Sequence, residues 1–333
     1  MPAAKKKQKN RTPAHAHASG PSRAHEKYQR LIDFCKTLPP TPTAVAHPCD
    51  QSSLQGAADA ARMGLIAPVL VGPKKRIEAI ARQHDIDISD LPIVDAPYSH
   101  ASAEKAVELV REGKAEALMK GSLHTDELMG AVVRRDSGLR TARRVSHCFV
   151  MDVPTHAETL IITDAAVNIA PTLEEKVDII QNAIDLAHAL QFKEVRVAIL
   201  SAMETVNPKV PSTVEAAALC KMADRGQITG AILDGPLALD NAISLESVQI
   251  KKIDSPVAGR ANVLVVPDLE AGNMLAKSLS FLANADAAGI VLGARVPIIL
   301  TSRADSLLTR LASCAVAALM AKARREASGK AMA

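Results

Sequence analysis

Short apolar runs alternate with longer amphipathic segments along the chain from about Glu26 onward. The apolar runs are, in order, TAVAHP, APVLVG, LPIVDA, EALMKG, VRVAILSA, GAILDGPLA, NVLVVPD and GIVLGARVPIILTS. They consist largely of Val, Ile, Leu and Ala, which is typical of strands that are covered on both faces. Helical periodicity between most of the runs, for example over 52–65, therefore predicts an open and mostly parallel α/β sheet.

The middle of the chain departs from this alternation. The stretch SHCFVMDVPTHAETLIITDAAVNIAP holds two apolar runs that are separated by only a short polar break. Two strands that follow each other so closely are expected to be neighbours in the sheet, and an antiparallel pair fits the short connection. A second domain is expected to begin near this point.

Open α/β sheets bind their ligands beyond the carboxyl ends of the strands, so the polar residues that end each run are candidates for a site. In LMKGSLHTDELM, Gly121 and Ser122 follow a strand, and Ser122 or Thr125 can cap the next helix. Exposed backbone N–H groups there, with Lys120 beside them and His124 as a further donor, would favour an anion such as phosphate. An ordinary capped turn explains the same residues equally well.

Two further clusters give weaker signals. Asp234 ends a strand in ILDGPLALDNAIS, where turn chemistry alone explains the Asp-Gly-Pro sequence. In VVPDLEAGNMLAKSL, Asp268 can cap a helix and Gly272 permits a close approach of another segment. Gly272 and Asn273 are poor helix formers so early in a helix, which indicates a packed or ligand-facing position.

The last apolar strand ends in PIILTSRAD, which places a hydroxyl, a guanidinium and a carboxylate within four positions. Ser302 and Asp305 have the spacing of a capping box. Capping does not explain Arg303, because a cation is unfavourable at the positive end of a helix. We therefore interpret Arg303 as a ligand for an anion, held by its planar fork of donors, with capping as a second role of its neighbours.

Composition narrows the classes of function. The chain is 48% hydrophobic but only 2% aromatic, which argues against a base-stacking nucleic-acid platform. The net charge is +4, and residues 1–25 hold six Lys or Arg and no acid, so the remaining chain is net −2. Residues 1–26 are predicted to be a disordered basic tail. A solubilising extension is the simpler interpretation of this tail, and contact with RNA or an anionic surface is the alternative.

The chain gives no sequence signal for a metal site, a membrane span or secretion. Five scattered Cys without a C-x-x-C motif suit a reducing cytoplasm, as small core residues. No apolar run approaches membrane-spanning length, and the tail lacks the apolar stretch of a signal peptide. A P-loop motif and an acidic cluster with metal-ligand spacing are both missing from the sequence.

Five motifs in order, LMKGSLHT, TDAAVNIAPTLEEK, DGPLALDNAIS, VVPDLEAGN and ILTSRADS, resemble the phosphate acetyltransferase/phosphate butyryltransferase family, and its butyryl-type branch most. The resemblance covers roughly residues 27–325. It implies the reaction acyl phosphate + CoA ⇌ acyl-CoA + orthophosphate, with an acetyl or butyryl group. It also implies that CoA is a substrate, that no cofactor or metal is required, and that the protein is a homodimer or a larger homo-oligomer.

The same resemblance implies a two-domain α/β/α fold like that of isocitrate and isopropylmalate dehydrogenases, with the active site in the interdomain cleft. By this analogy, residues 27–150 and 286–326 form the first domain. Residues 151–285 form an inserted second domain.

Matched motif by motif, Ser302 and Arg303 coincide with the family's Ser-Arg pair, which contacts the phosphoryl group and the transition state. The glycine-containing phosphate-site turn coincides with Gly121, Ser122, His124 and Thr125. Ser146 coincides with a serine-bearing strand that lines the cleft, and the candidate cleft-lining residues from the weaker clusters are Asp234, Asp268 and Asn273.

The sequence departs from the acetyl-type pattern at two places. Thr309 occupies the position of the acid proposed to deprotonate the thiol, so Asp305 is the nearby carboxylate. An arginine after the glycine turn is displaced, with Arg134 and Arg135 as its nearest counterparts. These departures keep open an alternative function, which is a non-catalytic or diverged acyl-CoA or acyl-phosphate binding protein of the same fold.

Overall fold

The computed structural model describes residues 26–301 and 305–331 of the 333-residue chain. The strands, in chain order, are β1 (Thr41–Ala46), β2 (Ile66–Gly72), β3 (Ile93–Asp95), β4 (Ala117–Lys120), β5 (Ser146–Asp152), β6 (Leu160–Thr163), β7 (Arg196–Leu200), β8 (Ile232–Leu237), β9 (Val263–Val265), β10 (Asp286–Leu292) and β11 (Ile298–Ile299). Each apolar run of the sequence thus forms a strand, and the last run forms two.

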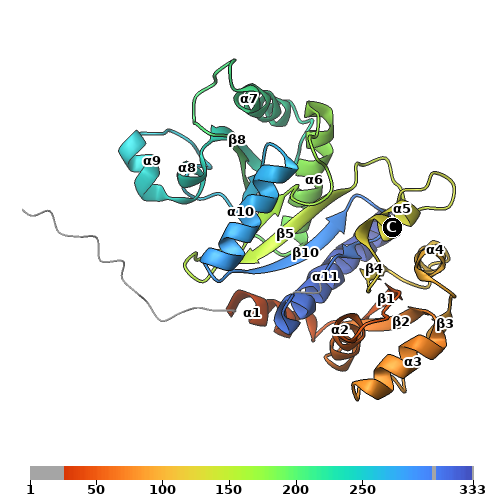
Figure 1. The fold of residues 1–333 in the computed structure, drawn as a ribbon. Coiled ribbons are helices and arrows are strands. Elements are labelled where there is room, and N and C mark those ends of the chain that lie inside the picture. The colour runs from red at the N-terminus through yellow and green to blue at the C-terminus, as the bar shows by residue number, and fades with distance from the viewer. Residues whose placement is uncertain (1–25, 302–304, 332–333) are drawn as a thin grey trace, which may run out of the picture.

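Helices connect most of these strands, as the alternating pattern predicts (Figure 1). They are α1 (Glu26–Cys35), α2 (Gln51–Arg62), α3 (Lys74–Gln83), α4 (Ser99–Arg111), α5 (Thr125–Val132), α6 (Leu173–Ala189), α7 (Pro211–Asp224), α8 (Leu239–Ile243), α9 (Leu245–Lys251), α10 (Leu269–Leu282) and α11 (Leu307–Ala331). The predicted basic tail lies outside the described residues, except for Glu26, which begins α1.

The described strands form one 11-stranded sheet in the order β3-β2-β1-β4-β11-β10-β5-β6-β9-β7-β8. The pairing is mostly parallel, which confirms the predicted α/β class. The antiparallel pairing of β5 with β6 is confirmed as well. β10 is also antiparallel to both of its neighbours, β11 and β5, so three antiparallel contacts join two parallel halves.

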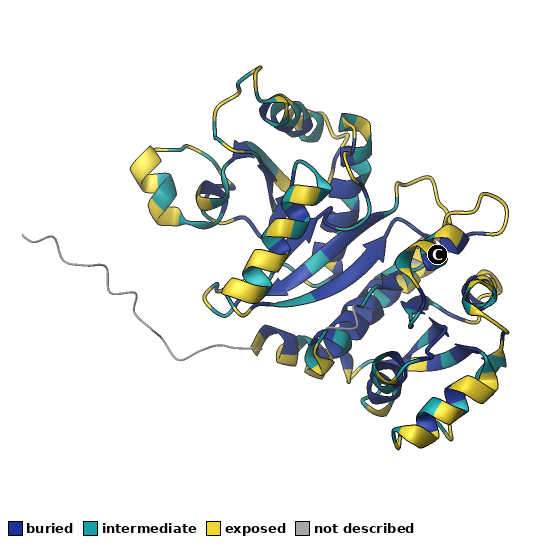
Figure 2. Cartoon of the chain, in the orientation of Figure 1, coloured by how far each residue is buried: buried dark blue, intermediate teal, exposed yellow. Residues whose placement is uncertain are grey.

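Helices cover both faces of the sheet, and the apolar core divides accordingly. On one face a single cluster of buried side chains runs the whole width of the sheet, from Ile77 to Leu219. The centre of this face is covered by α11, whose residues 311–321 are all buried (Figure 2). A helix that is apolar all round belongs in such an interior position.

On the other face the core is split into two clusters. The buried residues of one cluster lie within 44–139 and 291–298, under α4 and α5. Those of the other cluster lie within 151–285, around α8 and α10. This split coincides with the two predicted domains, although β5 crosses the boundary predicted after residue 150. The domain division itself stays a prediction.

α1 is fixed to the antiparallel centre of the sheet by buried polar contacts. Lys27 Nζ lies 2.6 Å from Asp152 Oδ1 in β5, and both side chains are buried. The Tyr28 hydroxyl donates to Val150 O and accepts from Ala288 N at 2.5 Å, so it ties β5 to β10. Losing one partner of a buried ion pair costs about 3–5 kcal/mol, so these contacts hold β5 and β10 in place beneath the site described next.

Candidate active site

A cavity of about 770 Å³ opens where β4 and β11 end, between the starts of α5 and α11 and the side of α10. It lies next to the place where the core on this face divides in two. Its polar lining consists of Lys120, His124, Thr125, His147, Lys277, Ser280, Asp286, Thr301, Asp305, Ser306 and Thr309. Two of the strand ends that the sequence singled out, those of β4 and β11, thus border this cavity.

Of the predicted site residues, Lys120, His124, Thr125 and Asp305 line this cavity. Ser302 and Arg303 lie outside the described residues. The described residues on either side of them, Thr301 and Asp305, both line the cavity. The roles predicted for Ser302 and Arg303 stay predictions.

Ser146 is not brought into the cavity. It is fully buried, and its Oγ accepts a hydrogen bond from Asn182 Nδ2 of α6 at 2.9 Å. The neighbouring His147 and Phe149 line the cavity instead. Side chains alternate between the two faces of a strand, so a shift of one residue moved the predicted side chain to the opposite face.

The residues from the two weaker clusters have local structural roles and do not line the cavity. Asp234 lies in β8 at the edge of the sheet, where its Oδ1 accepts from Gly235 N at 2.8 Å. Asp268 is the N-cap of α10, as predicted, and accepts from Ala271 N at 2.8 Å. Asn273 Nδ2 donates to Ala165 O at 3.3 Å.

Three backbone donors of the turn after β4 are already used within the protein. The N–H groups of Gly121 and Ser122 donate to Ala46 O and His47 O, at 2.8 and 2.9 Å. The N–H of His124, which is the N-cap of α5 in place of Ser122 or Thr125, donates to Glu127 Oε2 at 2.8 Å. These three groups are satisfied inside the protein, so an anion at this turn would be bound by side chains and by the first N–H groups of α5.

Gly121 has a structural reason to be glycine. A Cβ at this position would lie 2.4 Å from Ala46 O and 2.5 Å from His47 O. The turn therefore packs directly against the end of β1. Lys120 Nζ lies 3.2 Å from both Gly121 O and Leu123 O, so its ammonium also braces the turn at the cavity wall.

Asp305 does not lie in the first turn of α11, where the predicted capping box placed it, and its partner Ser302 lies outside the described residues. The helix begins only at Leu307, after Asp305. Ser306 Oγ accepts from Thr309 N at 3.1 Å and so caps the first turn. The backbone carbonyl oxygen of Asp305 accepts a hydrogen bond from Arg310 Nη2 at 2.6 Å.

Sequence reasoning missed Asp286, His147 and Lys277, which all line the cavity. Asp286 was missed because it begins its strand, whereas only strand ends were searched. β10 is antiparallel to β11, so its first residue meets the carboxyl ends of β4 and β11. A search of both ends of every strand near the antiparallel centre would have included it.

His147 is a neutral imidazole in this environment. It is 1% exposed, and burial lowers its pKa to about 4, although the charge of Asp164 opposes this shift. Its ring packs edge-on against Phe149 with the centroids 4.4 Å apart. Its Nδ1 has no hydrogen-bond partner within the described residues. His147 therefore adds no cation to the cavity at neutral pH, whereas Lys120 and Lys277 are lysines among the described lining residues.

The five cysteines are free thiols. Burial raises the pKa of Cys49 to about 11 and those of Cys35, Cys148, Cys220 and Cys314 to about 12. A thiol is nucleophilic as the thiolate, so these side chains are unreactive near neutral pH. This fits the prediction that the cysteines are small core residues.

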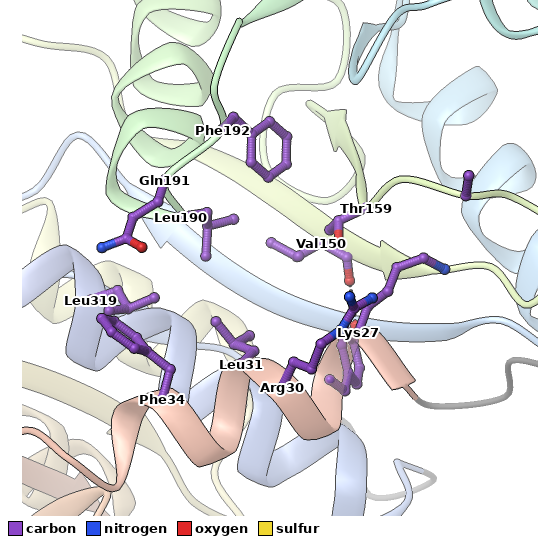
Figure 3. A pocket seen from close by; sticks show the side chains of 12 residues that line it. Lys27, Arg30, Leu31, Phe34, Val150, Thr159, Leu190, Gln191, Phe192 and Leu319 are labelled. Atoms are coloured by element: carbon purple, nitrogen blue, oxygen red, sulfur yellow. Dashed lines mark hydrogen bonds between the residues drawn. The ribbon is translucent and has the colours of Figure 1, made fainter.

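Neither a metal centre nor a membrane-spanning helix is found among the described residues. No group of three or more His, Cys, Asp or Glu in residues 26–301 and 305–331 is arranged to hold a metal ion. A search of the same residues finds no helix with the length and apolarity of a membrane span. A smaller cavity of about 270 Å³ lies between α1 and the end of α6, with Phe34 and Phe192 facing it (Figure 3), and it contains none of the predicted site residues.

Comparison with known proteins identifies the family. The model of the family described as phosphate acetyl/butaryl transferase matches residues 98–318. The chain belongs to this family.

Individual relatives agree with this assignment. The chain is 66% identical over 301 residues to a phosphate acetyltransferase of Rhizobium meliloti, covering 90% of this chain and 95% of that one. It is 40% identical over 296 residues to a phosphate butyryltransferase of Clostridium acetobutylicum, covering 89% and 98%. A solved branched-chain phosphotransacylase from Enterococcus faecalis is similar in structure, with a TM-score of 0.73, 31% identity and coverage of 84% and 98%.

The two departures from the acetyl-type pattern can now be placed. Thr309 lines the cavity from the first turn of α11. Arg134 does not line it, and its guanidinium pairs with Glu104 of α4 at 2.7 Å. Arg135 does not line it either. Of the positions that the resemblance marks as departures, Thr309 thus lies at the cavity and Arg134 and Arg135 do not.

Proposed function

We propose that this chain is a phosphate acyltransferase that interconverts a short-chain acyl-CoA plus orthophosphate with the acyl phosphate plus CoA. Family membership supports the reaction, together with a cavity at the joined ends of β4 and β11 that is lined by Lys120, Lys277 and two carboxylates. No cofactor or metal is required in this proposal, and CoA is a substrate.

The chemistry is a direct transfer in a ternary complex. The thiol of CoA attacks the acyl carbonyl carbon, and orthophosphate leaves with increased negative charge. We assign Arg303, with Lys120, His124 and Thr125, to the phosphate, and Ser302 to the developing oxyanion. The inert cysteines fit this scheme, because no acyl-enzyme is formed.

A base is needed because a free thiol has a pKa near 8.5, so only a few per cent is ionised at pH 7. Within the described residues, the carboxylates that line the cavity are Asp286 and Asp305. Asp305 is the candidate from the sequence, and Asp286 is the candidate that the structure adds.

We propose acetyl as the preferred acyl group, on the 66% identity with the Rhizobium meliloti phosphate acetyltransferase. The motif resemblance to the butyryl-type branch favours butyryl instead. One extra methylene is worth only about 1–3 kcal/mol in an apolar pocket, so both groups are to be tested.

The deciding assay measures initial rates of CoA release from acetyl-, butyryl- and isobutyryl-CoA, with and without orthophosphate. A phosphate acyltransferase releases CoA only when phosphate is present, and the highest kcat/KM identifies the acyl group. The alternative, a non-catalytic acyl-CoA or acyl-phosphate binding protein, predicts binding without phosphate-dependent release. It is not favoured, because the relatives are named as transferases.

We also propose a cytoplasmic homodimer of two-domain subunits. The free cysteines support a reducing compartment. Large apolar side chains are exposed on α10, where Met274, Phe281 and Leu282 are 63%, 82% and 85% accessible, and such a surface favours association. The proposed domains are residues 27–150 with 286–326, and 151–285. Light scattering of the purified chain tests the dimer.

A further inference from the structure

Asp286 occupies a place at the cavity that sequence reasoning did not consider. It is the first residue of β10 and pairs in register with Asp152 of β5. Its backbone carbonyl accepts from the Tyr28 hydroxyl at 3.1 Å, so its main chain is held by the sheet and by α1. Its half-buried side chain lines the same cavity as Lys120 and Thr301.

The carboxylate of Asp286 is oriented by α11. Thr309 Oγ1 donates to Asp286 Oδ1 at 3.4 Å, and Ser306 Oγ donates to Thr309 Oγ1 at 3.1 Å. All three side chains line the cavity. The two hydroxyls thus form a chain that ends on the carboxylate, and the first turn of a long helix fixes its geometry. A reacting group needs this kind of support to be positioned within fractions of an ångström.

Asp152, directly opposite Asp286, has a different environment. Its carboxylate is buried, pairs with Lys27 Nζ, and also accepts from the backbone N–H groups of Lys27 and Tyr28. It is therefore a structural anion, whereas Asp286 reaches the cavity one strand away. Asp305 also reaches the cavity, but it lies in the connection between β11 and α11, outside the sheet.

We infer that Asp286 is the carboxylate that takes the proton from the CoA thiol, with Thr309 as the residue that positions it. The inference rests on the proposed acyl transfer. A carboxylate oxygen of Asp286 accepts the S–H proton, and the sulfur electron pair forms the C–S bond to the acyl carbon. The C–O bond to the phosphoryl group breaks, and the phosphate leaves with that electron pair. The proton then passes from Asp286 to the phosphate, which restores the carboxylate.

The test is the pH dependence of acyl-CoA formation from acetyl phosphate and CoA, between pH 6 and pH 9. Asp286→Asn keeps the size of the side chain but removes the base, so kcat/KM for CoA at pH 7 should fall by about 10²–10⁴. The deficit should shrink about tenfold per pH unit up to the thiol pKa near 8.5, because the variant depends on thiolate formed in solution. Among the described residues, the other ionisable groups at the cavity are Lys120, His124, His147, Lys277 and Asp305. The Tyr28 hydroxyl contacts the backbone of Asp286. None of these residues is substituted in this comparison.

Three further variants make the result specific. Thr309→Val should lower kcat about tenfold, and Thr309→Ser should restore it, because a hydroxyl on Asp286 is worth on the order of 1–2 kcal/mol. Asp33→Asn, on the exposed side of α1, is the matched control and should retain full activity. Asp305→Asn should show a deficit that does not change with pH. Circular dichroism and the unfolding midpoint check that each variant is folded.

The inference is overturned if folded Asp286→Asn loses less than about threefold at pH 7, if its deficit is constant from pH 6 to pH 9, or if Asp305→Asn shows the pH-dependent deficit instead. Failure of the proposed function is separate and visible in the wild-type protein. In that case wild type itself forms no acetyl-CoA from acetyl phosphate.

Discussion

Two neighbouring strands, β4 and β11, end side by side at the same cavity, and the chain leaves them in different ways. They are parallel and in register, with Ile298 opposite Leu118. After β4 the turn is held by backbone hydrogen bonds from Gly121 and Ser122 to the end of β1, and α5 carries Asp126 and Glu127 in its first turn. After β11 the connection is longer, and α11 has no acidic residue in its first turn.

This difference indicates which of the two connections, the one after β4 or the one after β11, binds an anion more favourably. A helix start that already carries carboxylates has its positive end compensated from within the protein. The positive end of α5 therefore contributes little to phosphate binding. The contribution from this side of the cavity comes mainly from the side chains of Lys120, His124 and Thr125. We expect the leaving phosphate to lie closer to the β11–α11 connection, which contains Arg303.

The largest effect is expected from Arg303→Ala. Loss of one charge-stabilising donor typically lowers turnover by about 10²–10³, and Arg303 is assigned to the group on which charge accumulates. Initial rates of acetyl-CoA formation measure the change, with Arg295→Ala, an exposed arginine between β10 and β11, as the control. If the Arg303→Ala protein folds and keeps near-normal turnover, the phosphate does not depend on the β11–α11 connection, and the proposed difference between the two helix starts is wrong.

Gly121→Ala tests how tightly the turn after β4 is packed. The added Cβ would lie 2.4 Å from Ala46 O, so the turn must move. We expect a loss of about 1–3 kcal/mol in the free energy of unfolding, measured with urea. Gly130→Ala in α5 is the matched control, because nothing lies within 4 Å of its Cβ. That control should be neutral or stabilise by about 0.5–1 kcal/mol, and equal behaviour of the two variants would contradict the packing argument.

Lys120→Met tests whether Lys120 binds phosphate in addition to stabilising the turn after β4. Its ammonium lies at the cavity wall, so the KM for orthophosphate should rise about tenfold, with a smaller change in kcat. Lys114→Met, on the loop before β4, provides a lysine whose side chain is exposed. An unchanged KM for phosphate would mean that the β4 side makes no contact with the anion.

Glu127→Gln is expected to have the smallest effect. Hydrogen bonds, first from the Ser99 hydroxyl and then from the N–H of His124, lower the pKa of the Glu127 carboxyl. A depressed folded-state pKa stabilises the protein above the unfolded value, near 4.3, and this stabilisation is lost as the pH falls through the folded value. The variant should therefore be less stable than wild type by under about 1 kcal/mol at pH 7 and equal to it in acid. Urea unfolding at both pH values measures this.

Glu127→Gln also tests whether phosphate binds at the start of α5 or at the start of α11. If the backbone N–H groups and the positive end of α5 bound the phosphate, removal of the Glu127 charge would tighten phosphate binding. We expect an unchanged KM for phosphate.

Much of the fold follows from the pattern of apolar runs, because strands buried on both faces carry a strong and continuous signal. The run GIVLGARVPIILTS shows what the apolar pattern does not reveal, which is the direction of each strand. It forms two antiparallel strands with Gly293 between them at a φ of +85°. Periodicity does not encode strand direction, so the antiparallel centre was foreseen for β5 and β6 only.

The sequence predicted cavity-lining residues that follow the carboxyl ends of strands. It missed those whose position depends on the direction of a strand or on the register of its side chains. Lys120 and Asp305 were found because they follow apolar runs. Asp286 was missed because its strand runs the opposite way, and Ser146 was chosen one residue away from the cavity-facing His147. The satisfied N–H groups of the β4 turn depend on a contact with β1, which no local pattern reveals.

The most direct test is a crystal structure of the protein with orthophosphate and CoA bound. We predict a phosphate in the cavity at the end of β11, within hydrogen-bonding distance of the Arg303 guanidinium, and the CoA sulfur on the side of Asp286. A phosphate bound elsewhere, with Arg303 turned to bulk solvent or engaged only in an internal ion pair, would contradict the account.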